Sequence, residues 1–261
     1  MRGFLEDVGN MSNSEYLKAI TNAQSIEELW DMHVKRMAIY GFDRLLYGFT
    51  RYRTTTSLGD PEDFVILTNH DPAYTDIFMG QQLYFHAPMV KWVLENEGAC
   101  SWNILRKMMD SGTLTQSERK VIEFNVSMNV LAGYSISFKS ISPRAKGAIA
   151  LTARANISQD EIDEVWAKHG EEIIVMNNIA HLKIMTLPQS VPGRGLTKRQ
   201  KEALEWVGDG KTTQDIALLM GLTPATVEKH LRLARDALNV ETTAQAVLKA
   251  ALQNQMFVIE A

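Results

Sequence analysis

Short apolar segments and longer amphipathic ones alternate along the first 185 residues. Segments rich in β-branched and aromatic residues, or with alternating apolar and polar positions, predict strands at 44–52, 63–69, 133–140 and 147–153. Apolar residues at helical spacing predict helices at 25–40, 72–84, 87–97, 115–131 and 158–184. A turn at 143–147 would join the last two strands as a hairpin. This order predicts a central antiparallel sheet with helices on its faces.

The pattern after residue 195 is helical throughout. Thr197, with Gln200 three residues later, forms a capping box that opens the first helix. Pro224 stands at the first position of the third helix, where its missing N–H costs nothing. Four short helices are expected, at about 198–208, 212–220, 224–238 and 243–255.

The stretch 186–195 carries two prolines and two glycines between two helical patterns, which is typical of a linker. The fold class expected is therefore α+β, in two domains. An N-terminal α/β/α sandwich with a central antiparallel sheet spans 1–185, a linker spans 186–195, and a small all-α four-helix domain spans 196–261.

Composition is that of a soluble globular protein, with 45% hydrophobic and 22% charged residues. No apolar run approaches the roughly 20 residues that span a bilayer, and the first residues do not resemble a signal peptide. We therefore expect a cytoplasmic protein without membrane association. Cys100 is the single cysteine, so there is no intramolecular disulfide, and a packed free thiol is expected rather than a reactive one.

The net charge of −4 is unevenly divided along the chain. From Arg194 onward there are nine Lys and Arg against eight Asp and Glu, whereas the remainder has 18 against 23. The tail is only slightly basic, so any affinity for nucleic acid would depend on where its charges are placed and on dimerisation.

The stretch "LTPATVEKHLRLARDAL" at 222–238 has one apolar and one polar side. An apolar stripe for the core is formed by Val227, Leu231, Ala234 and Leu238. A short helix and a glycine turn precede it, which is the helix-turn-helix order, whose second helix enters the major groove of DNA. Alternatively, the cations of the polar side merely solvate a surface helix.

The tail resembles the GerE-type helix-turn-helix of LuxR-family transcription regulators, through motifs such as Leu196-Thr197, Gly210-Lys211-Thr212, His230-Leu231 and Gln245-Ala246-Val247. The resemblance implies binding to double-stranded operator DNA and a structural role for His230. The residues expected to face DNA are Thr226, Glu228, Lys229, Arg232 and Arg235, with Lys211 and Thr212 as candidate phosphate contacts.

Several positions depart from that family pattern. Gln200 replaces a glutamate, Leu233 an asparagine, Ala237 a lysine, and Thr242-Thr243 an Asn-Arg pair. Because some of these changes remove polar or cationic groups, we expect an intact fold with weaker and more salt-sensitive DNA binding.

Residues 15–185 resemble the autoinducer-binding domain of the same family of quorum-sensing regulators, most informatively at 69–102. The resemblance implies that an acyl-homoserine lactone or an analogue is the signal, and that no cofactor is needed. Its expected ligand-binding positions are His70, Tyr74, Phe78, Ala87, Trp102 and Ala150, with Ser135 and Thr152 as neighbouring hydroxyls.

Ala87 is the most informative of these positions, because the family has there an aspartate that accepts the ligand's amide N–H. A buried amide without its acceptor costs about 1–3 kcal/mol. Either the pocket binds an acyl-homoserine lactone with a rearranged polar grip, or it binds a related molecule that depends less on an amide, or no ligand is needed. The aromatic residues are alternatively ordinary core, and His70 and His86 surface or capping groups.

The overall prediction is a small-molecule-responsive, DNA-binding homodimer that regulates transcription. The alternative is a ligand-independent or DNA-binding-impaired protein that dimerises with another regulator and sequesters it. An enzyme is not expected, because the sequence has no glycine-rich phosphate loop, no nucleophile elbow and no residues at metal-ligand spacing.

Overall fold

A computed structural model describes residues 11–140, 142–189 and 195–257. The chain divides into two compact units, one with residues up to 23 and 27–185, the other with 24–26 and 186–261. Half of the expected linker, 190–194, lies outside the described residues. Its first part is held within the second unit, where the backbone N–H of Gln189 donates to the carbonyl of Gln253 at 2.9 Å.

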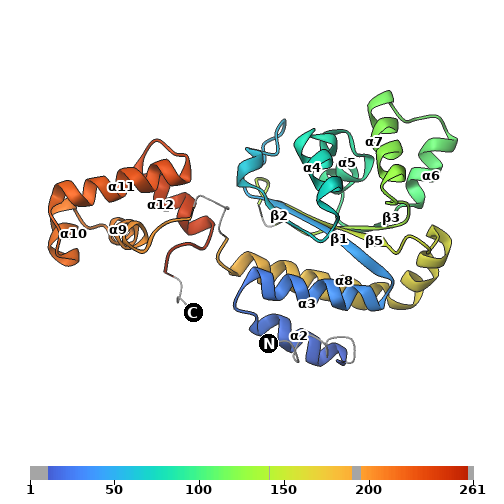
Figure 1. Cartoon of the computed structure of the whole chain (residues 1–261), viewed down its shortest axis with the longest axis horizontal. Coiled ribbons are helices and arrows are strands. Elements are labelled where there is room, and N and C mark those ends of the chain that lie inside the picture. Colours follow the sequence, from blue (N-terminus) through green and yellow to red (C-terminus); the bar gives the residue numbers. More distant parts are fainter. Residues whose placement is uncertain (1–10, 141, 190–194, 258–261) are drawn as a thin grey trace. The chain divides into compact units, whose positions relative to one another are not determined.

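A five-stranded antiparallel sheet in the order β2-β1-β5-β4-β3 forms the middle layer of the first unit (Figure 1). Its strands are β1 (Phe42–Thr50), β2 (Val65–Thr68), β3 (Gly98–Ser101), β4 (Gly133–Ser137) and β5 (Lys146–Ala153). Four of them were predicted, with ends shifted by up to three residues. β3 was missed because Gly-Ala-Cys-Ser has neither β-branched residues nor a clear alternation. Cys100 in this strand is half-buried.

Helices cover both faces of this sheet, which confirms the α/β/α sandwich. In Figure 1 one layer contains α3 and α8, and the opposite layer contains α4 to α7. The helices are α2 (Asn13–Asn22), α3 (Ile26–Ile39), α4 (Pro72–Gly80), α5 (Pro88–Glu95), α6 (Asn103–Asp110), α7 (Gln116–Ser127) and α8 (Gln159–Thr186), with 3-10 turns η1 (Pro61–Asp63) and η2 (Leu83–His86).

Three differences from the expected helices have local causes. The helix expected at 72–84 divides into α4 and η2 because Gln82 is in the left-handed conformation, with φ of 58°. Both α2 and α6 were missed, although α2 opens with a capping box of Ser12 and Glu15. In α6 the polar and apolar residues are well separated, but eight residues give the pattern little length.

The two faces of the sheet carry side chains of different size. Large buried residues such as Tyr47, Tyr134, Ile136 and Leu151 pack toward α3 and α8, and the Tyr134 ring stacks on Trp166 with centroids 3.8 Å apart. The opposite face carries small residues along its middle, Gly48, Ala148 and Ala150. One side of the sheet is therefore densely filled, and the other leaves space.

A hydrogen-bonded chain of buried side chains joins α2, α3 and α8. Tyr16 Oη lies 2.7 Å from His33 Nδ1, and His33 Nε2 lies 3.0 Å from Asn177 Oδ1. The amide oxygen of Asn177 accepts, so His33 carries its proton on Nε2 and accepts from the Tyr16 hydroxyl through Nδ1. His33 is fully buried, and desolvation lowers its pKa to about 4.

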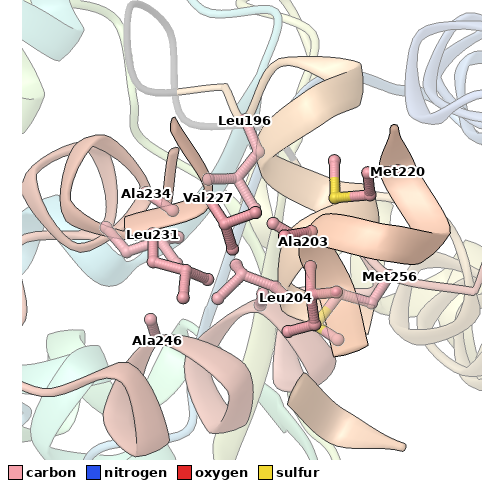
Figure 2. Packing of buried hydrophobic residues seen from close by; sticks show 13 residues of the cluster. Leu196, Ala203, Leu204, Met220, Val227, Leu231, Ala234, Ala246 and Met256 are labelled. Carbon is pink, nitrogen blue, oxygen red and sulfur yellow. The ribbon is translucent and has the colours of Figure 1, made fainter. Parts of the chain in front are cut away.

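The second unit consists of α9 (Lys198–Gly208), α10 (Thr213–Met220), α11 (Pro224–Leu238) and α12 (Thr243–Leu252), the four helices expected. Thr197, Thr212 and Thr242 each open a helix through a capping box, and Gly221 ends α10 with φ of 66°. Figure 2 shows the core they enclose, where Val227 and Leu231 of α11 lie among side chains of the other helices. The predicted apolar stripe of α11 is buried along its whole length.

The buried His33 predicts a loss of stability in mild acid. Its pKa is lower in the folded chain than the usual 6.5, so the unfolded chain binds more protons between about pH 6.5 and 4. The contribution of His33 to the free energy of unfolding should be fully present above about pH 6.5. It should fall by on the order of 3 kcal/mol as the pH approaches 4.

Urea titrations between about pH 7.5 and 4.5 measure this slope. We expect His33→Gln to be less stable at neutral pH but to have a shallower slope, because it has no imidazole to protonate. The exposed His86 provides the control, and His86→Gln should keep the wild-type slope. If His33→Gln and wild type have equal slopes, protonation of His33 is not the cause of the loss of stability in acid.

Candidate ligand cavity and DNA-binding face

A cavity of about 360 Å³ lies against the small-residue face of the sheet in the first unit. Its walls come from α4, η2, α5 and α7, and their side chains are mostly apolar. The eight positions expected to bind a ligand all line this one cavity: His70, Tyr74, Phe78, Ala87, Trp102, Ser135, Ala150 and Thr152. The structure thus brings together residues that lie up to 82 positions apart in the sequence.

The floor of the cavity is a shallow groove made by small side chains on neighbouring strands. Ala148 pairs with Gly48 on β1, and Ala150 pairs with Ser135 on β4. Because alternate residues of a strand share a face, Ala148, Ala150 and Thr152 all point into the cavity. The small, apolar side chains of this floor suit an apolar chain.

A stack of aromatic rings forms one end of the cavity. Tyr74 lies between His70 and Phe78, with ring centroids 4.6 and 5.3 Å away, and it also stacks on Phe124 at 5.4 Å. Its hydroxyl donates to Asn125 Oδ1 at 3.2 Å, and burial raises the pKa of this phenol. Asn125 was not among the expected ligand positions, and it lies in α7, outside the most informative stretch of the resemblance at 69–102.

His70 is buried, so the alternative that it is a surface group is wrong, whereas His86 is exposed. Desolvation, assisted by the positive charge of Arg44, lowers the pKa of His70 to about 4. The imidazole is therefore neutral at physiological pH, with one nitrogen that donates and one that accepts. Its Nε2 lies 3.4 Å from Thr152 Oγ1, which is a loose contact that leaves both groups adaptable.

Ser135 is positioned by a tryptophan. The indole N–H of Trp102 donates to Ser135 Oγ at 2.9 Å, and both side chains are buried. The Ser135 oxygen is thus held as an acceptor, and its own hydrogen has no acceptor among the described residues. In a dry site such a hydroxyl is ready to donate to a ligand oxygen.

Ala87 leaves the cavity without the acceptor that the family's aspartate would supply. Its methyl group lines the cavity at the start of α5, just before Pro88. Among the described residues that line the cavity there is neither aspartate nor glutamate. The site can donate to ligand oxygens, but it offers no carboxylate to a ligand N–H.

The polar side of α11 is only partly available. Lys229 and Arg232 are exposed, and Arg235 is half-buried. Arg232 pairs with Asp236 of the next turn, with Nη1 and Oδ2 3.1 Å apart, and Arg235 Nη1 donates to Thr243 Oγ1 at 2.8 Å. The cations therefore form an exposed ridge, but two of the three already have partners within the chain.

The remaining expected DNA contacts lie beside this ridge. Glu228 is exposed and accepts from the Thr213 hydroxyl at 2.9 Å, and Thr226 is half-buried near the start of α11. Lys211 is exposed just before α10. Thr212 caps that helix, and its hydroxyl donates to Asp215 Oδ2 at 2.6 Å, so a phosphate there would meet a carboxylate. His230, expected to be structural, is half-buried.

A domain with an apolar cavity, followed by a helix-turn-helix with a cationic ridge, is the arrangement of a ligand-responsive regulator. The autoinducer binding domain matches residues 25–184, and the luxR family of bacterial regulatory proteins matches residues 194–250. The chain belongs to this LuxR family of transcriptional regulators, and the family is not one of enzymes.

Relatives and solved structures agree with this placement. The transcriptional activator AnoR of Acinetobacter nosocomialis is 24% identical over 91% of this chain and 96% of its own. LuxR of Aliivibrio fischeri is 24% identical over 73% of this chain and 74% of its own. The crystal structure of Escherichia coli SdiA has the same fold, with a TM-score of 0.51, 17% identity, and coverage of 94% of this chain and 98% of SdiA. Within the described residues no helix has the length and apolarity to cross a bilayer.

Filling the groove tests whether the cavity binds ligand. We expect Ala150→Leu to weaken binding of N-decanoyl-homoserine lactone or 1-decanoylglycerol at least tenfold, because the added carbons occupy the space of the chain. The variant itself should unfold at an equal or higher temperature, since apolar space is filled. Thermal shift with increasing ligand measures both.

Ala73→Leu is the matched control, because Ala73 lies on the exposed side of α4 beside Tyr74. It should bind the same probes as wild type does. Undiminished binding by Ala150→Leu would exclude the groove as the ligand site.

Releasing Arg232 from its ion pair should strengthen DNA binding. A surface pair of this kind stabilises a helix by only about 0.3–0.5 kcal/mol, so Asp236→Asn costs little stability. It frees the guanidinium and removes a negative charge from the ridge. We expect affinity for a duplex to rise about threefold to tenfold in fluorescence anisotropy at fixed salt concentration.

Asp209→Asn, which removes an exposed carboxylate at the end of α9, controls for net charge. If it raises affinity as much as Asp236→Asn does, total charge rather than the ion pair is responsible.

Proposed function

We propose that this LuxR-family regulator binds DNA in response to a small acyl-chain signal that occupies the cavity of its first unit. The observation that carries the proposal is the cavity itself, whose apolar groove ends at a cluster of neutral hydrogen-bonding groups. Without a ligand, the apolar side chains that line this cavity lack the contacts of a packed core. A ligand that completes the core therefore stabilises the folded state by mass action.

The head group of the signal meets His70, Thr152, Ser135 and the Tyr74 ring. These groups suit a lactone or ester carbonyl, and Ala87 gives nothing to an amide N–H. We therefore favour an acyl signal whose recognition depends on its oxygens, either an acyl-homoserine lactone gripped differently or a related ester. A structure of SdiA with octanoyl-rac-glycerol has the same fold, with a TM-score of 0.50 and 17% identity, and its ligand has no amide.

Dimerisation links the signal to DNA in this proposal. Exposed apolar side chains on α8 and α12, Leu182 and Leu248, are 62% and 61% exposed and provide surface for a second copy. A homodimer would set two α11 helices about one DNA turn apart, so that each reads half of an operator. The cytoplasm is the compartment in which such a regulator meets both DNA and signal.

The second candidate function is sequestration of another regulator by dimerisation. It is favoured by the internal partners of Arg232 and Arg235 and by the uncharged Ala237 and Thr243 at positions where the family pattern has cations. Both candidates share the fold and the cavity, and they differ in whether a duplex is bound.

Substitution on α11 separates the two. Duplexes would first be selected by the wild-type protein from a random library with N-decanoyl-homoserine lactone or 1-decanoylglycerol present. We expect Arg232→Ala to weaken binding to the selected duplex about tenfold or more, because a base or phosphate contact is lost. Ligand binding, measured by thermal shift, should be unchanged.

Lys168→Ala removes an exposed cation from α8 and is the control, with DNA affinity expected within twofold of wild type. If Arg232→Ala binds as tightly as wild type, α11 does not present this face to DNA. If no duplex is selected at any ligand concentration, sequestration becomes the better account.

A further inference from the structure

The end of the cavity opposite the aromatic stack is occupied by a lysine. Lys146 is the first residue of β5, and it faces the same side as Ala148, Ala150 and Thr152. A strand rises about 3.3 Å per residue, so the floor extends roughly 20 Å from Thr152 to Lys146. A chain-shaped ligand with its head at His70 therefore points its other end toward Lys146.

Lys146 is buried with few compensating partners. It is only 9% exposed, and its Nζ donates to the carbonyl oxygen of Asn96 at 3.0 Å. An ammonium group has three hydrogens to donate. Among the described residues, the Asn96 carbonyl is the one hydrogen-bond acceptor recorded for it, and no carboxylate lies within ion-pair distance. A buried charge in this position is unfavourable unless it finds further acceptors.

The charged groups around Lys146 do not supply the hydrogen-bond acceptors that its ammonium group lacks. Desolvation lowers the pKa of the amine, the carboxylate of Glu97 opposes that shift, and Arg53 adds to it. The carbonyl of Asn96 ends α5, so the helix dipole contributes some negative potential.

Lys146 stands where the apolar cavity ends. It lines the ligand cavity and also a second hollow, whose other walls include Arg53, Glu95, Asn96 and Glu97. The carboxylates belong to the second hollow and not to the ligand cavity. Lys146 is therefore the residue that separates the apolar cavity from the polar second hollow.

We propose that Lys146 determines specificity by binding an oxygen acceptor, best a carboxylate, at the distal end of the signal's chain. The inference rests on the proposed function, in which an acyl chain occupies the groove. It assigns the signal to a class with oxygen at both ends and apolar carbons between them. The ammonium of Lys146 would complete its hydrogen bonds with that terminal oxygen.

Matched pairs of probes test the assignment in the purified full-length chain. One pair is 1-decanoylglycerol and the glycerol half-ester of decanedioic acid, and the other is N-decanoyl-homoserine lactone and its analogue with a terminal carboxylate. Calorimetry gives the affinity ratio within each pair. We expect wild type to bind the carboxylate member roughly tenfold more tightly or better, as a charge-assisted hydrogen bond would give.

Lys146→Met keeps the shape of the side chain and removes its charge, so it should reverse the preference toward the methyl-ended probe. Lys139→Met removes an exposed lysine after β4, and it should keep the wild-type ratio. Because the ratio is taken within one protein, a general loss of stability does not mimic the result. If wild type binds the methyl-ended member equally well or better, the role of Lys146 is wrong while the proposed function stands. If wild type binds none of the four probes, the acyl-chain ligand itself is wrong, and this inference falls with it.

Discussion

The structure of the first unit depends on the small side chains that one face of the sheet presents. Gly48, Ala148 and Ala150 lie on adjacent strands in register, and no large residue reaches across to replace the missing volume. Protein interiors are normally packed to crystal-like density, so an unfilled space of this size works against folding. A chain-shaped apolar molecule in this space would restore that density.

The lining of the cavity differs in polarity from one end to the other. Neutral donors and acceptors gather around His70 and Ser135, the middle is apolar, and a cation stands at the beginning of β5. In a low-dielectric interior each of these polar groups needs a hydrogen-bond partner. The groups that lack a partner within the chain therefore indicate where a ligand would carry its own polar atoms. In the second unit the polar groups already have partners within the chain. Arg232 is paired with Asp236, and Arg235 donates to Thr243, although both cations belong to the face expected to bind DNA.

Much of this arrangement could be predicted from the sequence. The long α8, the strongly periodic α11 and the alternating β1 and β5 were predicted with small errors at their ends. The eight residues expected at the ligand site all line the cavity. What local pattern could not supply was pairing across long separations. The partner of Trp102 is 33 residues away and that of Arg235 lies in the next helix, so their hydrogen bonds have no local signature. From the sequence, Lys146 is expected to be a solvated residue of the turn at 143–147. In the structure it is the first residue of β5 and lies on the cavity side of the sheet. For His70 the sequence left both a ligand-binding and a surface role open, because its contacts with Tyr74 and Thr152 depend on the tertiary fold.

Because the two faces of the sheet are packed unequally, the two helical layers should differ in local stability. The layer of α3 and α8 is complete without any signal, since Tyr134, Trp166 and the His33 network fill it. The layer of α4 to α7 rests on a hollow, so it is the part that opens first by local fluctuation. Amide hydrogens in that layer should therefore exchange with solvent faster than those of α3 and α8.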